Sequence, residues 1–161
     1  MNLRRALLAL ALVSVSSSAL AATATDQFDV TIQVKNKCVI TASDIDFGSA
    51  DDLGTALNST GTVNVKCNHK GGAYAVSFNL GTGAGATAAA RKMTELGGDT
   101  VDYGLYSDVA RSVALGGAAT LAGDSTLNRD KNFTVYARVF GGQNGKTVGD
   151  YADTVTATVT Y

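Results

Sequence analysis

The sequence has few of the side chains that enzymes and metalloproteins use most, with one histidine and two cysteines among its 161 residues. A histidine-dependent triad or a zinc site would have to use His69, yet no nucleophile motif accompanies that residue. The formal net charge is only −1 at pH 7, which does not favour nucleic acid or an anionic membrane as a partner. We therefore expect no enzyme activity: no catalytic residue, metal site, cofactor or small-molecule substrate. His69 is interpreted as a solvated loop residue.

Long apolar runs are also scarce, and the one at the N-terminus has the features of a secretory signal. Arg4 and Arg5 form a charged region, residues 6–13 form a short apolar region, and residues 19–21 (Ala-Leu-Ala) fit the cleavage pattern. A membrane anchor would need about 20 apolar residues, and this run is too short. Residues 1–21 are therefore predicted to be a signal peptide that is cleaved after Ala21.

The two cysteines, Cys38 and Cys67, lie in the part of the chain that export would expose to an oxidising compartment. An even number of cysteines in an exported protein most simply indicates a disulfide. A pair of free, buried thiols is the alternative.

The rest of the chain alternates apolar and polar residues in many short runs, which are separated by turns rich in Gly, Asn and Asp. This pattern predicts an all-β protein of the sandwich type in one domain. Residues 86–93 are the one place where a short helix is considered. The runs expected to form strands are Cys38–Ser43, Ile45–Ser49, Thr62–Cys67, Ala73–Leu80, Thr100–Tyr106, Asn132–Phe140 and Asp153–Tyr161.

A further alternating run precedes the first cysteine, in residues 26–37. Its apolar members, which alternate with polar residues, are Phe28, Val30, Ile32 and Val34. Strict alternation indicates a strand with one buried face, and such a strand needs a groove. Either its own domain supplies that groove or another chain does.

The other end of the chain has the complementary property. The last predicted strand reaches Tyr161, the final residue, whereas a complete immunoglobulin-like sandwich would usually have a closing strand beyond it. Folding of the first run into its own domain would fill the gap within one molecule. Exchange between molecules would fill it in a head-to-tail polymer.

Several motifs also resemble one known family. They are Ile45-Asp-Phe-Gly-Ser49, Val63-Asn-Val-Lys-Cys67, Arg91-Lys-Met93, Asp102-Tyr-Gly-Leu-Tyr-Ser-Asp108, Val135-Tyr-Ala-Arg-Val139, Gly142-Gln143 and the ending Gly149-Asp-Tyr-Ala-Asp-Thr-Val-Thr-Ala-Thr-Val-Thr-Tyr161. In their order along residues 38–161 they resemble the spore coat protein U domain, the pilin family of archaic (Csu-type) chaperone–usher pili. Related sequences often have a tryptophan near residues 112–117, and this chain has none.

The resemblance implies an incomplete immunoglobulin-like pilin that lacks its closing strand. A periplasmic chaperone would lend it a strand, an outer-membrane usher would export it, and a neighbouring subunit would then donate its N-terminal segment. Carried over by position, the donor residues are Phe28, Val30, Ile32 and Val34. The family disulfide falls on Cys38 and Cys67. The acceptor groove is expected along Val155, Ala157, Val159 and Tyr161.

We therefore expect a structural rod subunit of a surface fibre for attachment and biofilm formation. Its expected divisions are the signal peptide in residues 1–21, a donor extension in residues 22–37 and a pilin domain in residues 38–161. The alternative is a tip adhesin or a coat protein that binds a surface ligand through exposed apolar loops, for which Gly116–Leu121 is the candidate. An exported enzyme is the least favoured interpretation.

Overall fold

The computed structural model describes residues 21–68, 71–127 and 129–161. The predicted signal peptide, except for Ala21, and His69 lie outside the described residues. The chain divides into two units, one ending at Gln33 and a compact one formed by residues 34–161. In the first unit, residues 21–33 have no regular secondary structure.

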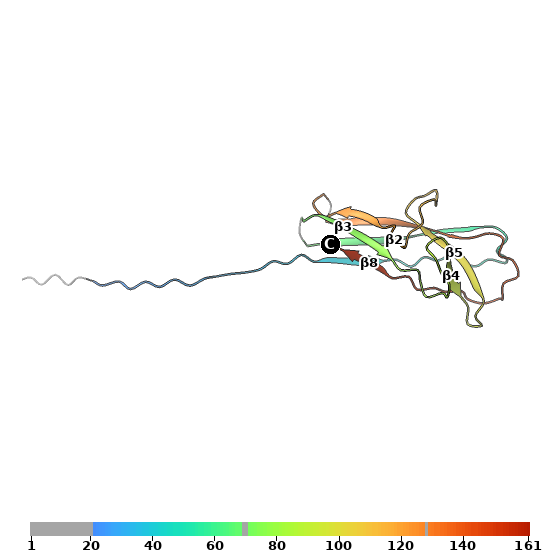
Figure 1. Ribbon diagram of the computed structural model, residues 1–161, viewed down its shortest axis with the longest axis horizontal. Helices are drawn as coiled ribbons and strands as arrows, with labels where there is room; N and C mark the ends of the chain where they lie inside the picture. Colours follow the sequence, from blue (N-terminus) through green and yellow to red (C-terminus); the bar gives the residue numbers. More distant parts are fainter. Residues whose placement is uncertain (1–20, 69–70, 128) are drawn as a thin grey trace, which may run out of the picture. The chain divides into compact units, whose positions relative to one another are not determined.

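The compact unit is built from strands joined by turns and loops (Figure 1). No helix is assigned in the described part of the chain, and so none there has the length or the apolarity to cross a membrane. The strands are β1 (Cys38–Ala42), β2 (Leu57–Cys67), β3 (Ala73–Phe78), β4 (Arg91–Thr94), β5 (Thr100–Tyr106), β6 (Leu121–Asp124), β7 (Asp130–Val139) and β8 (Ala157–Thr160).

These strands form two sheets of unequal width. The wider sheet has five strands in the order β1-β2-β7-β5-β4, and the narrower one has three in the order β6-β3-β8. Each pairing within the sheets is antiparallel. The all-β sandwich predicted from the alternating runs is confirmed.

The core lies between the inner faces of the two sheets. In β2, Val63 and Val65 are buried whereas Thr62 and Lys66 are exposed, and β3 and β7 alternate in a similar way. The period of two that indicates strands in the sequence therefore also selects the residues that face the core. The buried apolar cluster consists of Val63, Val65, Cys67, Tyr74, Val76, Phe78, Val101, Tyr103, Leu105, Leu115, Leu121, Val135, Ala137 and Val139.

The helix considered for residues 86–93 is wrong. Residues 91–94 form β4, which pairs with β5 through a register that places Arg91 opposite Tyr103. The preceding residues form a loop in which Thr87 and Ala90 exchange backbone and side-chain hydrogen bonds. Here the pairing with β5 outweighs the helix propensity of the alanines.

The expected strand at residues 45–49 is replaced by a turn. The Asp46 carboxylate accepts a hydrogen bond from the Gly48 N–H at 2.7 Å, and Gly48 has a φ of 73°. This is the left-handed region, which glycine adopts without steric cost. The last expected strand is also shorter than predicted, because β8 begins at Ala157 rather than at Asp153.

Candidate functional site: a groove between two strand edges

A groove of about 380 Å³ opens between the two sheets. Residues 42–47, which follow β1, form one rim, and residues 151–157, which lead into β8, form the other. The floor includes Val63, Leu105 and Val135 from the wider sheet, with Phe78 from the narrower sheet. Because the narrower sheet has fewer strands, part of the apolar inner face of the wider sheet stays accessible at this place.

The β8 rim presents both main-chain groups and apolar side chains to the groove. The Asn79 N–H donates to the Thr156 carbonyl at 3.0 Å, so Thr156 directs its main chain toward β3. Antiparallel pairing alternates, so Ala157 and Val159 direct their N–H and C=O groups to the opposite edge. Beyond that edge the described residues provide no paired strand.

The β1 rim has the same arrangement. The Ser43 N–H donates to the Thr62 carbonyl and the Asn68 N–H donates to the Lys37 carbonyl, so odd-numbered residues bond to β2. Ile40 and Ala42 therefore direct their main-chain groups to the free edge of the wider sheet. Both edges thus offer unpaired backbone groups, which is the property that invites a further strand.

The structure places three of the four predicted acceptor residues along the β8 rim, which continues from residues 151–157 through the rest of β8. Val155, Ala157 and Val159 are partly buried and pack against the core cluster, and the first two line the groove. Tyr161 lies at the end of the rim and is 55% exposed. The threonines between them are exposed, as alternation predicts.

The four predicted donor residues, in contrast, are exposed. The exposed fractions are 86% for Phe28, 85% for Val30, 90% for Ile32 and 77% for Val34. Exposure of four large apolar side chains at alternate positions is unfavourable in water. Their role remains a prediction that concerns a second chain.

Cys38 and Cys67 form the expected disulfide, with a Cα–Cα distance of 4.1 Å. The two residues face each other across β1 and β2. Because the odd-numbered residues of β1 make the hydrogen bonds to β2, Cys38 and Cys67 form a non-hydrogen-bonded pair, in which side chains come closest. The disulfide fixes the β1 rim to the wider sheet at the end where β1 begins.

Sequence reasoning missed a buried polar group at the other rim. Arg91 is completely buried, and its guanidinium donates to the carbonyls of Asn79 and Leu115. The Tyr103 hydroxyl donates to Asp153 at 2.7 Å, and both of these residues line the groove. The sequence does contain one indication of this group. Asp153 alternates in register with Val155 and Ala157, so its side chain is expected to face inward, where a carboxylate without a partner would be costly.

Burial shifts the pKa values of this group. Burial raises the pKa of Tyr103, and its hydrogen bond to Asp153 raises it further, so that the phenol stays neutral. Burial also raises the pKa of Asp153, but hydrogen bonds from Thr82, Tyr103 and Thr154 outweigh burial and leave that pKa below its usual range. Burial lowers the pKa of Arg91, and the neighbouring Tyr103 and Asp153 oppose this.

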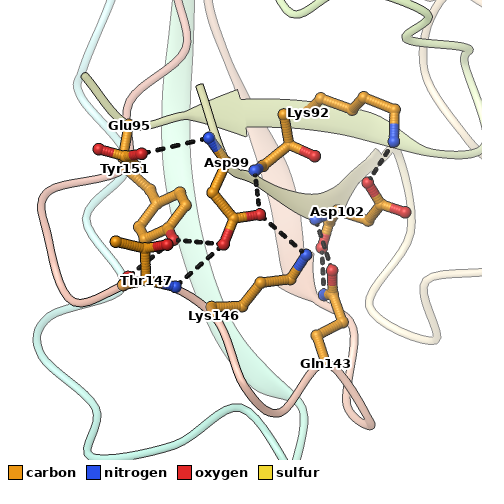
Figure 2. A network of polar contacts seen from close by, with 9 residues as sticks. Lys92, Glu95, Asp99, Asp102, Gln143, Lys146, Thr147 and Tyr151 are labelled. Carbon is orange, nitrogen blue, oxygen red and sulfur yellow. Dashed lines mark hydrogen bonds and ion pairs between the residues drawn. The ribbon is translucent and has the colours of Figure 1, made fainter. Parts of the chain in front are cut away.

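A second polar network holds the loop that precedes the β8 rim (Figure 2). The Asp99 carboxylate accepts hydrogen bonds from the Thr147 N–H at 2.9 Å and from the Tyr151 hydroxyl at 3.3 Å, and it pairs with Lys146 at 3.4 Å. The N–H groups of Thr147 and Thr100, in that order, lower the pKa of Asp99 to about 2. The carboxylate is therefore ionised at neutral pH and fixes residues 146–151 against the β4–β5 turn.

The loop proposed from the sequence as an apolar contact surface does not have that character. In Gly116–Leu121, Leu121 is buried, and Gly117 and Ala118 are exposed. In the part of the chain that the structure describes, the large apolar residues that are fully exposed are instead Leu96, in the β4–β5 turn, and Val148. Within residues 21–68, 71–127 and 129–161, no group of three or more His, Cys, Asp or Glu side chains could hold a metal ion.

Solved structures with a similar fold come from pilus systems. One is the CsuC–CsuE chaperone–tip subunit pre-assembly complex of the archaic chaperone–usher Csu pili of Acinetobacter baumannii, with a TM-score of 0.58, 22% identity and 80% coverage of this chain. This chain spans only 40% of the matched one. A second is a chaperone–tip adhesin complex of CFA/I fimbriae, with a TM-score of 0.44, 10% identity, and coverage of 75% of this chain and 41% of the matched chain. A third is the E. coli Hda pilus minor tip subunit HdaB, with a TM-score of 0.44, 17% identity, and coverage of 74% of this chain and 80% of the matched chain.

A comparison with curated proteins gave no match. The model of the Spore Coat Protein U domain family, however, matches residues 24–158. This range includes the predicted donor residues, both cysteines and most of the β8 rim. As its motifs predict, the chain belongs to the Spore Coat Protein U domain family.

Proposed function

We propose that this protein is a pilin subunit of a chaperone–usher surface fibre and that it polymerises by donor-strand exchange. One observation carries the proposal: a groove with a free strand edge on each side occurs in a chain that also has an exposed, alternating apolar segment. The groove lacks a strand and the segment lacks a groove. Exchange between molecules satisfies both, and a contact that does not close on itself produces a filament.

The chemistry of the segment suits the groove. In an extended conformation, Phe28, Val30, Ile32 and Val34 project to one side at intervals of about 6.6–6.8 Å. Burial of four such side chains contributes roughly 6–12 kcal/mol before the cost of ordering the segment. Backbone hydrogen bonds to Ala157 and Val159 on one side and to Ile40 on the other would complete the two edges.

The edges of β1 and β8 lie close together. The Cα atoms of β1 and β8 approach within 8 Å, whereas two strands that flank a third are about 9.6 Å apart. A donated strand must therefore separate these edges as it enters. We expect insertion to start at the open end, between residues 42–47 and 151–157, where the groove already exists.

The need to cover the open groove also explains the proposed assembly partners. A subunit with an open apolar groove requires a cover before it polymerises, which a periplasmic chaperone would supply by lending a strand. An outer-membrane usher would then export it, and the fibre at the cell surface would serve attachment. In this scheme residues 1–21 are the signal peptide, residues 22–37 the donor extension and residues 38–161 the pilin domain, with no enzymatic role.

Deletion of residues 26–34 tests this proposal. The shortened mature chain should retain the disulfide and the groove, and it should co-purify with a co-expressed cognate chaperone yet form no fibres in electron micrographs. Thr31→Asp in the full chain is the control, because its charge lies on the outward side of the donor segment. Fibres of normal length from the deletion variant would refute donor-strand exchange.

A second candidate is contact with a surface through one end of the molecule, as a tip adhesin or coat protein would make. Leu96 and Val148 are fully exposed, and their loops are joined because the Thr147 N–H donates to Asp99. Adsorption of the purified protein to an alkyl-coated surface should fall when Leu96→Ser and Val148→Ser are combined. Unchanged adsorption would leave the rod subunit as the better description.

A further inference from the structure

The residues that lead into β8 do not belong to one sheet only. Ala152 exchanges backbone hydrogen bonds with Thr94 at the edge of β4, at 2.9 and 3.2 Å. Four residues later, Thr156 pairs with Asn79 just beyond β3. Asp153 thus lies where the chain crosses from the wider sheet to the narrower one. The direction of the whole β8 rim depends on how this crossing is held.

The Asp153 side chain makes a dense set of contacts at the crossing. One carboxylate oxygen, Oδ1, accepts from the Thr82 N–H at 2.6 Å, from the Thr82 hydroxyl at 2.8 Å and from the Thr154 N–H at 2.8 Å. The other, Oδ2, accepts from the Tyr103 hydroxyl at 2.7 Å. Gly81 has a φ of +89°, and a Cβ there would lie 2.0 Å from Oδ2, so the loop leaves room for the carboxylate only because it has glycine at this position.

Arg91 stabilises the end of the crossing at which Thr156 pairs with Asn79. Its guanidinium donates to the Asn79 carbonyl, and the Asn79 side-chain oxygen accepts the Thr156 N–H at 2.8 Å. It also donates to the Leu115 carbonyl at 2.8 Å, while Nε has no partner among the described atoms. A buried cation with incomplete hydrogen bonding needs a nearby negative charge. Tyr103 lies opposite Arg91 in the β4–β5 pairing and donates to Asp153, whose charge opposes the lowering of the Arg91 pKa by burial.

We propose that Arg91, Tyr103 and Asp153 form a latch that holds the β8 rim in position to accept a strand, and that Tyr103 and Asp153 are positioning residues for that step. The inference rests on the proposed function. Its physical basis is that an ordered rim need not be ordered again when a strand arrives, which favours binding. The main-chain groups of Ala157 and Val159 point into the groove only while the crossing at Asp153 is fixed.

The test uses the full mature chain carrying Ile32→Asp, so that the chain does not donate its own segment and the groove stays open. A labelled synthetic peptide of residues 25–36 is the probe, and its affinity is measured by fluorescence anisotropy. Tyr103→Phe removes a single hydroxyl from the latch and keeps the aromatic ring in the core. Tyr136→Phe removes a hydroxyl from the outer face of β7 and is the matched control.

We expect Tyr103→Phe to weaken peptide binding roughly tenfold or more, the effect of losing one hydrogen bond to a charged group. Backbone hydrogen exchange in residues 155–160 should accelerate by a similar factor, while exchange in residues 130–139 of β7 stays unchanged. A purely structural role would instead accelerate exchange in both segments. Thr82→Ala, which removes a different hydroxyl from Asp153, should reproduce the selective effect if Tyr103→Phe does not fold.

Exchange in residues 155–160 that equals that of the Tyr136→Phe control would overturn the latch. Failure of the proposed function looks different, because the parent chain would then bind no peptide. If the parent binds no peptide and Tyr103→Phe still accelerates exchange in residues 155–160 alone, donor-strand exchange fails and the assignment of Tyr103 and Asp153 to strand acceptance fails with it. Peptide binding that is equal in Tyr103→Phe and Tyr136→Phe would also reject that assignment.

Discussion

The hydroxyl of Tyr103 and the carboxylate of Asp153 are joined by a 2.7 Å hydrogen bond between β5 and the segment that leads into β8. Tyr103 belongs to the wider sheet, and β8, which follows Asp153, belongs to the narrower one. The bond therefore connects the two layers beside the groove. The described residues place no strand beyond the free edge of β8, so side-chain bonds such as this one help to set the position of the rim.

Asp153→Asn should destabilise the protein. The amide can no longer accept all the hydrogen bonds that the carboxylate receives. Loss of a hydrogen bond to a charged group costs about 1.5–3 kcal/mol, and we expect a decrease of that size in the free energy of unfolding. Urea titration measures it, with the exposed Asp150→Asn as control. Equal stability of the two variants would contradict this role.

The strands with clear alternation could be predicted from the sequence, and the short edge strands β4 and β6 could not. In β2, the alternation of apolar and polar residues is enough to predict that Val63, Val65 and Cys67 face inward. β4 and β6 have four residues each and lack that alternation, so tertiary pairing defines them. β4 follows an alanine-rich run whose local propensity favours a helix, and its pairing with the next strand, β5, overrides that propensity.

The candidate site divides in the same way. The inward series Val155, Ala157 and Val159 could be predicted, because a rim strand keeps the same alternation. The latch could not be predicted, since Arg91 bonds to carbonyl groups of Asn79 and Leu115 that any residue type would supply. Backbone acceptors leave no trace in a sequence. The one indication in the sequence was that Asp153 occupies a position where the alternation predicts an inward-facing apolar residue.

Removal of the disulfide should destabilise the β1 rim. Cys38 and Cys67 are 29 residues apart, and closing a loop of that length stabilises the folded state by about 3.6 kcal/mol in the chain-entropy description. The double substitution Cys38→Ala with Cys67→Ala should lower the urea midpoint accordingly. Val39→Ala, at an exposed position in β1, is the control. A midpoint that did not respond to the double substitution would show that the β1 rim is held by its backbone pairing alone.

Stability should decrease in acid partly through Asp99. Hydrogen bonds from the N–H groups of Thr147 and Thr100 hold the pKa of Asp99 at about 2, below the usual 3.8. Because the folded-state pKa is the lower one, this contribution is complete above about pH 4 and is lost as the pH falls toward 2. The stability difference between the wild type and Asp99→Asn should therefore be constant near neutrality and shrink between pH 4 and 2. Urea midpoints across this range measure it, and a difference independent of pH would contradict the assignment.

Single substitutions should abolish the donor role and the acceptor role of this chain independently of each other. Ile32→Asp places a charge in the donor segment and leaves the groove intact, whereas Ala157→Asp places one in the groove and leaves the donor segment intact. Each variant alone should stay monomeric, because a charge in an apolar slot is strongly disfavoured. Thr31→Asp and Thr158→Asp, whose side chains face outward, are the matched controls and should still form fibres.

An equal mixture of Ile32→Asp and Ala157→Asp should give dimers and nothing longer. The intact donor segment of the second variant fills the intact groove of the first, after which neither free end can continue the chain. Analytical ultracentrifugation distinguishes this result from its alternatives. A mixture that stayed monomeric would show that an intact segment does not fill an intact groove, which would contradict donor-strand exchange. Fibres from either variant alone would show that residues 32 and 157 do not meet in the assembled polymer.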